Sequence, residues 1–205
     1  VAPYTFSESG GGLEMRATLP LHGLVFARAI RLEGERVRFF ETVENLTALD
    51  RPIAYTQHVT LGPPFLECGK TEFRMPGTLS MTYPTDFAGP NGYLPLAAKF
   101  DWPHAPRRDG KGTVDMRRLQ NVPASVGFTT HLLDPHRDGA WFAAWSPSSK
   151  LLFGYEWKRS DFPWMGIWEE NHSRATPPWN GRTLTRGMEF GASPFPESQI
   201  GRAHV

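Results

Sequence analysis

The chain has 205 residues, of which 40% are hydrophobic and 13% aromatic, enough to form one sizeable core and about one domain. Its formal charge of +1, with no run of lysine or arginine longer than two, excludes a basic surface of the kind that gathers nucleic acid or anionic lipid.

The cysteine content and the longest apolar runs limit the compartments and partners that we expect. Cys68 is the only cysteine, which excludes an intrachain disulfide and a thiol-rich metal site and favours a reducing, cytoplasmic location. No apolar run approaches the roughly 20 residues of a membrane-spanning helix, and no signal peptide is visible from Val1 onward. We therefore expect neither a membrane nor a nucleic acid as a partner.

Short segments with the two-residue alternation of half-buried strands follow one another along the chain. They are residues 13–19, 24–32, 36–43, 53–61, 124–133, 140–145, 150–157 and 166–170. No segment keeps a helical period for more than two turns. These patterns predict an all-β, antiparallel fold with a single domain over residues 1–199.

The segments between these strands carry turn and loop signals. Residues 33–35 (EGE) predict a hairpin turn, and residues 62–64 (GPP) must end the strand before them because proline cannot donate to a sheet. Residues 67–78 are predicted to form another hairpin. Residues 83–115 are rich in proline, glycine and aspartate and lack periodicity, so they predict a long excursion of loops.

The last six residues, IGRAHV (200–205), have an unusual coding possibility. They can be encoded as atc gga aga gca cac gtc, which matches a widely used sequencing-library adapter. We interpret residues 200–205 as adapter read-through and leave them out of the fold prediction. On this interpretation the chain is a gene fragment that is truncated at both ends.

The segment WMGIWEEN (164–171), followed by PPWNG (177–181), sets two adjacent carboxylates among three indoles. The indoles are Trp164, Trp168 and Trp179. Indole faces stack on the C–H faces of sugar rings, and carboxylates hold or deprotonate sugar hydroxyls, so this composition predicts a carbohydrate site. The alternative is a strand with core tryptophans and two surface glutamates.

In an extended strand, Glu169 and Glu170 point to opposite faces of the sheet, so we expect only one of them to enter a cleft. The sequence leaves open which one. Asn171 and Arg174 follow and are candidates for binding sugar hydroxyls, although they could instead cap a turn.

A second candidate site lies at Gln57 and His58. In a strand, His58 shares its face with Thr56 and Thr60, which leaves room for a ligand. Imidazole is the side chain whose ordinary pKa allows it to donate or accept a proton near neutral pH. The alternative is a structural histidine that bonds a backbone carbonyl. We include the adjacent Gln57 among the candidate substrate-binding residues.

Other motifs are absent from the sequence. His104 and His131 lack the nearby ligands of a zinc motif, so no metal site is expected. A Gly-x-Ser-x-Gly elbow, a phosphate loop and a dinucleotide fingerprint do not occur, which argues against serine hydrolase chemistry and nucleotide use.

Four segments together resemble the aldose 1-epimerase, or galactose mutarotase-like, family. ENLT (44–47) and PIAYTQHVTLGPPFL (52–66) resemble the family's asparagine-containing turn and the strand that carries its functional histidine. GIWEEN (166–171) resembles the strand with its catalytic glutamate, and RGMEFGASPFPE (186–197) resembles the end of uncharacterised bacterial members.

The resemblance implies a β-supersandwich of large twisted antiparallel sheets with a small-molecule sugar in a cleft on one face. It makes His58 the acid that protonates the ring oxygen and Glu169 or Glu170 the base that removes the anomeric hydroxyl proton. This chemistry needs no metal or nucleotide cofactor. An acid and a base that bracket a pyranose should have polar atoms about 5 to 8 Å apart.

The sequence also departs from the family pattern. Better-known mutarotases have Asn-His-x-Tyr-Phe-Asn-Leu around the histidine, where this chain has QHVTLG (57–62), and His22 is a poor match for their second histidine. Two other functions therefore stay open. One is a non-catalytic carbohydrate-binding domain on the same fold, and the other is a polysaccharide lyase or hydrolase that uses Tyr55, Tyr83 or Arg174.

Overall fold

The computed structural model describes residues 3–50 and 53–195. They contain 15 β-strands and two short 3-10 helices, Pro20–His22 (η1) and Gly89–Asn91 (η2), and no α-helix. The predicted all-β fold is confirmed. None of the helices in this part of the chain is long and apolar enough to cross a membrane. The segment interpreted as adapter read-through lies outside the described residues.

The chain divides into two compact units, Val1–Pro52 and Ile53–Val205, and we describe each by itself. The single domain expected over residues 1–199 stays a prediction.

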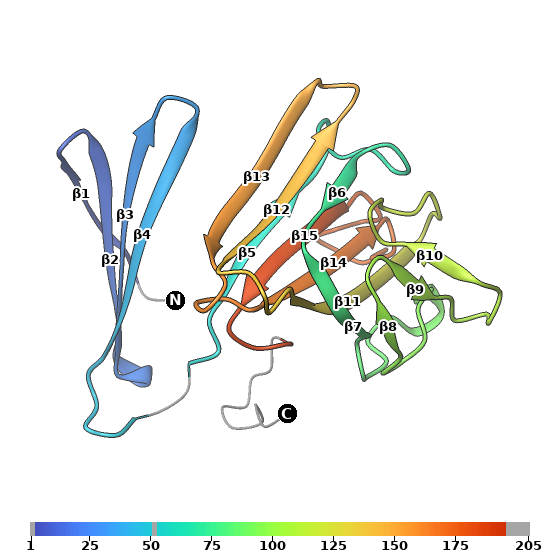
Figure 1. The fold of residues 1–205 in the computed structure, drawn as a ribbon, viewed down its shortest axis with the longest axis horizontal. Coiled ribbons are helices and arrows are strands. Elements are labelled where there is room, and N and C mark those ends of the chain that lie inside the picture. Colours follow the sequence, from blue (N-terminus) through green and yellow to red (C-terminus); the bar gives the residue numbers. More distant parts are fainter. Residues whose placement is uncertain (1–2, 51–52, 196–205) are drawn as a thin grey trace. The chain divides into compact units, whose positions relative to one another are not determined.

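The first unit is an antiparallel meander of four strands in the order β1-β2-β3-β4 (Figure 1, blue). The strands are β1 (Thr5–Ser9), β2 (Gly12–Leu19), β3 (Leu24–Glu33) and β4 (Arg36–Asn45). Gly34, with φ of +61°, makes the predicted turn between β3 and β4, because a left-handed backbone there favours glycine. The alternation in the sequence located β2, β3 and β4 to within a few residues, whereas β1 was not predicted.

The second unit is built around a six-stranded antiparallel sheet in the order β5-β15-β14-β11-β7-β8 (Figure 1). The strands are β5 (Thr56–Leu61), β15 (Leu184–Gly191), β14 (Trp164–Asn171), β11 (Ser125–Leu133), β7 (Gly77–Thr82) and β8 (Lys99–Asp101). β5 pairs with β15, which is more than 120 residues away in the chain, so the sheet brings the two segments with the candidate residues together.

A three-stranded sheet packs against one face of the six-stranded sheet. Its strands, in order, are β13 (Leu151–Lys158), β12 (Gly139–Ser146) and β6 (Glu72–Arg74). The core between the two sheets is formed by Met165, Ile167, Met188 and Phe190 on one side and by Ala140, Phe142 and Ala144 on the other. The opposite face of the six-stranded sheet does not contribute to this core.

The prediction of a hairpin over residues 67–78 was wrong. β6 pairs with β12 in the smaller sheet, whereas β7 pairs with β11 in the larger one. Pro76 lies between them and has no N–H to donate, which suits a crossing between sheets better than a hairpin ladder.

The predicted loop excursion of residues 83–115 is largely irregular and holds only short elements. These are η2, β8, β9 (His104–Pro106) and β10 (Thr113–Asp115), of which β9 and β10 form a two-stranded sheet. The excursion supplies Phe87 and Tyr93, both of which contact the candidate site strands.

Candidate functional site

The pairing of four strands sets one row of residues across the face of the six-stranded sheet that lies opposite the core. His58 on β5 is directly opposite Glu189 on β15, Glu189 is opposite Gly166 on β14, and Gly166 is opposite Thr130 on β11. Because side chains alternate along a strand, all four point to the same face. We call the face that carries this row the site face.

The functional groups in the row are an exposed imidazole and a buried carboxylate in direct contact. His58 Nε2 lies 3.0 Å from Glu189 Oε1, and the side chains are 65% and 7% exposed, respectively. His58 Nδ1 lies 3.0 Å from Thr60 Oγ1, which fixes the orientation of the ring. Burial raises the pKa of Glu189 above its ordinary value of 4.5, and the nearby His58 partly opposes that rise. This pair can therefore both donate and accept protons.

Glycines next to Glu189 make the space that its side chain occupies. A Cβ at Gly187 would lie 2.7 Å from Glu189 Oε1, and one at Gly166 would lie 3.0 Å from the ring of Phe128. The first distance is shorter than real Cβ contacts, and the second is tighter than nine in ten of them. The absence of side chains at these positions lets the carboxylate lie close to the sheet beside His58.

Two of the predicted indoles flank the row. Trp164 and Trp168 precede and follow Gly166 by two residues on β14 and therefore share the site face. Each lies opposite a glycine on β15, Trp164 opposite Gly191 and Trp168 opposite Gly187. The two tryptophans therefore lie on the site face on either side of the row that carries His58 and Glu189, and sugar stacking on them stays a prediction.

The ring of Trp168 is already in contact with two other side chains, Phe87 and Arg174. Phe87 stacks on its ring with centroids 5.2 Å apart. The guanidinium carbon of Arg174 lies 5.3 Å from the Trp168 ring centroid and 4.8 Å from that of Trp179. Arg174 is thus held between two indoles, an arrangement that the sequence did not predict.

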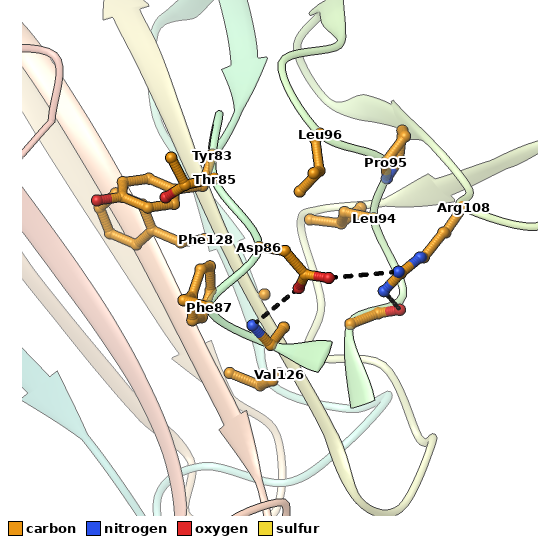
Figure 2. A pocket seen from close by; sticks show the side chains of 13 residues that line it. Tyr83, Thr85, Asp86, Phe87, Leu94, Pro95, Leu96, Arg108, Val126 and Phe128 are labelled. Atoms are coloured by element: carbon orange, nitrogen blue, oxygen red, sulfur yellow. Dashed lines mark hydrogen bonds and ion pairs between the residues drawn. The ribbon is translucent and has the colours of Figure 1, made fainter. Parts of the chain in front are cut away.

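The loop that carries Phe87 borders a small cavity, which Figure 2 shows from close by. Asp86 accepts a hydrogen bond from Gly89 N at 2.8 Å, and its other oxygen lies 3.6 Å from Arg108 Nη2. Arg108 Nη1 also donates to the carbonyl of Gly89 at 2.6 Å. These contacts hold the loop that presses Phe87 against Trp168. The cavity itself measures only about 20 Å³, room for about one water, so it is not a sugar site.

Glu170 shares the site face but serves the loop that follows β14. It is buried, and its carboxylate accepts hydrogen bonds from Ser173 N at 2.6 Å, from Ser173 Oγ at 2.7 and 2.8 Å, and from Arg174 N at 3.2 Å. It lies four residues along β14 from Gly166 and two strands from His58, about 13 Å along the sheet and about 10 Å across it. Glu170 is therefore not beside His58.

Glu169 lies on the opposite face, in the core. Its side chain is 1% exposed, and Oε1 accepts a hydrogen bond from Arg186 Nη1 at 2.7 Å. The hydroxyl of Tyr93 donates to Oε2, and burial raises the pKa of Tyr93 well above its ordinary value, so that the donor proton is retained. Arg186 also donates to the carbonyl of Met116. This network is structural.

The assignment of the base to Glu169 or Glu170 therefore does not fit the geometry. The two-residue alternation correctly predicted that Glu169 and Glu170 lie on opposite faces of the sheet. However, Glu169 is paired with Arg186, and Glu170 accepts hydrogen bonds from Ser173. The carboxylate that contacts His58 is Glu189. Its signal in the sequence is Gly187-x-Glu189-x-Gly191, a carboxylate flanked by glycines on its own face of a strand.

Two candidate substrate-binding residues also lie away from the row. Gln57 points to the opposite face from His58 and donates to the hydroxyl of Tyr55 at 3.1 Å. Asn171 is buried and donates to the carbonyls of Gln120 at 3.2 Å and Val122 at 2.9 Å. Asn171 thus ties the end of β14 to the loop before β11.

Metal ligation has no support in this part of the chain. Among the described residues no group of three or more His, Cys, Asp or Glu side chains could hold a metal ion.

Exchanging each carboxylate for an amide should distinguish the structural glutamate from the one at the site. At pH 7, Glu169→Gln should lower the free energy of unfolding by about 3 to 5 kcal/mol, because it leaves the buried Arg186 without a counter-charge. Urea denaturation followed by tryptophan fluorescence measures this change.

The matched variant Glu189→Gln should change that free energy by less than about 1 kcal/mol. The raised pKa of Glu189 means that its ionised form destabilises the native state as the pH rises above 4.5, and an amide removes this effect. Equal losses in the two variants would contradict the distinction.

Comparison with solved structures supports the fold. The chain is similar to a crystal structure described as a "putative aldose 1-epimerase" from Klebsiella pneumoniae subsp. pneumoniae MGH 78578, with a TM-score of 0.57 and 14% sequence identity. The similarity covers 94% of this chain and 45% of that protein, so the chain spans less than half of its length. No protein-family model matches the sequence, and no curated protein matches it either. The β-sandwich of this chain therefore has an aldose 1-epimerase-like fold.

Proposed function

We propose that the site face binds a small-molecule sugar and that His58 and Glu189 interconvert its anomers, the reaction of an aldose 1-epimerase. The observation that carries this proposal is the contact of an exposed imidazole with a buried carboxylate between Trp164 and Trp168. The structural likeness to the Klebsiella protein is consistent with it.

The proposed reaction is a pair of coupled proton transfers. Glu189 removes the proton from the anomeric hydroxyl while His58 Nε2 donates a proton to the ring oxygen. The bond between the anomeric carbon and the ring oxygen breaks, and the anomeric carbon becomes an aldehyde. The former ring oxygen is now a hydroxyl group. After the aldehyde rotates, this hydroxyl attacks its other face and gives its proton back to His58, while Glu189 returns its proton to the aldehyde oxygen, which becomes the anomeric hydroxyl again. Acid and base are thereby regenerated.

The two groups must lie near each other for this reaction, because the ring oxygen and the anomeric hydroxyl are bonded to the same carbon. The observed 3.0 Å is shorter than the 5 to 8 Å expected for a pair that brackets a pyranose. In the proposed site the sugar separates the two side chains. His58 is the group that can move, since it is 65% exposed, whereas Glu189 is enclosed beside Gly187.

A non-catalytic sugar-binding domain is the second candidate function. Trp179 is 40% exposed and presents an indole to solvent, as a binding platform does. A lyase or hydrolase finds less support, because Tyr55 packs on Phe162 and Tyr83 packs among Phe87 and Phe128 instead of joining the row.

Removing either proton-transfer group should abolish most of the anomer exchange. We expect His58→Ala and Glu189→Gln each to lower the catalysed rate by about 10²- to 10⁴-fold, the usual contribution of a general acid or base. Exchange NMR of the α and β anomers of a panel of aldoses measures the rate.

His136→Ala is the matched control, because His136 is an exposed histidine outside the site face. It should keep the rate of the unmodified chain. If His58→Ala catalyses exchange as fast as His136→Ala, His58 is not the acid.

The rate should also depend on the ionisation of Glu189. Its pKa is raised by burial, and only the ionised form can act as the base, so the rate should fall as the pH falls through a value above 4.5. A pH profile of anomer exchange measures this limb. In Glu189→Gln the residual exchange rate should not show this fall at acidic pH. If the variant keeps the same fall, the ionisation of another group causes it.

A further inference from the structure

The guanidinium of Arg174 is held in place by two indoles, but its positive charge is only weakly neutralised by a carboxylate. Its guanidinium lies between the indoles of Trp168 and Trp179, at 5.3 and 4.8 Å from the ring centroids. Stacking on two aromatic rings fixes the plane of a guanidinium and leaves its N–H edge available for hydrogen bonding.

Glu170, the carboxylate nearest to the Arg174 guanidinium, already accepts hydrogen bonds from other groups. Arg174 Nε lies 3.6 Å from Glu170 Oε2, beyond hydrogen-bond distance. The same carboxylate accepts hydrogen bonds from Ser173 N, Ser173 Oγ and Arg174 N. Among the residues that the structure describes, the two Nη groups of Arg174 have no hydrogen-bond partner, and the side chain is 40% exposed.

This cation lies near the proposed site of chemistry. Trp168 is on the site face, two residues along β14 from Gly166, which is opposite Glu189. Two residues of a strand span about 7 Å, and Arg174 lies directly over the Trp168 ring. A pyranose whose anomeric carbon is between His58 and Glu189 could therefore direct its far end toward Arg174.

We propose that Arg174 binds an anionic group, a carboxylate or a phosphate, on the substrate sugar at the end away from its anomeric carbon. This inference rests on the proposed sugar site and specifies its substrate class as acidic sugars. A planar guanidinium with free N–H groups matches both anions through paired hydrogen bonds, whereas a neutral hydroxymethyl group leaves its charge uncompensated.

Binding measurements test this subsite separately from the reaction. The probes are glucose, glucuronate and glucose 6-phosphate, titrated by calorimetry into the unmodified chain. We expect at least one of the two anionic sugars to bind about 10-fold or more tightly than glucose, the size of effect expected for charge-assisted hydrogen bonds. The comparison of the two anionic sugars distinguishes a carboxylate site from a phosphate site.

Three variants locate the effect. Arg174→Gln should bring the affinity for the anionic sugar down to that for glucose, and Arg174→Lys should keep only part of the difference because lysine cannot form the paired, stacked contact. Arg182→Gln is the matched control, since it removes the same charge from an exposed position in the same loop, and it should keep the full difference.

Two results would overturn the subsite. One is equal affinity for the neutral and anionic sugars in the unmodified chain. The other is binding of inorganic phosphate alone as tightly as glucose 6-phosphate, which would indicate a simple anion site.

The subsite and the reaction can fail separately. Arg174-dependent binding without anomer exchange would support the subsite and contradict the epimerase activity. Exchange with equal use of glucose and the anionic sugars would support the activity and contradict the subsite. If no sugar binds, both are contradicted.

Discussion

The ion pair between Glu169 and Arg186 fixes the alignment of the two strands on which the candidate site depends. The two residues are directly opposite each other on β14 and β15, and both side chains are fully buried. A shift of β15 by one residue against β14 would move Arg186 to the site face, leave Glu169 without its partner in the core and send Glu189 into the core. Because an unpaired buried charge is costly, the pair strongly disfavours such a shift.

The two buried carboxylates on neighbouring strands differ in what their partners allow. Glu169 is paired with an arginine, which does not release its proton in proteins, so this pair can only hold structure. Glu189 contacts a histidine, whose ring nitrogens can both donate and accept a proton. The same residue type therefore serves the core on one face of the sheet and proton transfer, as we propose, on the other. Glu170 adds a third use, since it orders the loop that places Arg174 between two indoles.

Local pattern was sufficient to predict most of the strands and the face of His58. Two-residue alternation located β2 to β5 and β11 to β14, and it correctly placed Thr60 beside His58. The resemblance in the sequence agrees with the aldose 1-epimerase-like fold. These features depend on neighbours in the sequence, which a single chain reveals directly.

The remaining features depend on contacts between distant segments. Glu189 meets His58 only because β15 pairs with β5, and the sequence contains no local sign of that pairing. Glu169 is bonded by Arg186 from the neighbouring strand β15, which its position beside Trp168 in the sequence does not indicate. Likewise, Phe87 reaches Trp168 from a loop without periodicity.

The most direct test of the central claim is a crystal structure of the chain with a bound aldose. The proposed site predicts the ring oxygen within hydrogen-bond distance of His58 Nε2 and the anomeric hydroxyl on Glu189, with the 3.0 Å contact between the two side chains opened. A sugar stacked on Trp179 with the His58–Glu189 contact intact would contradict the acid–base role and identify the chain as a sugar-binding domain.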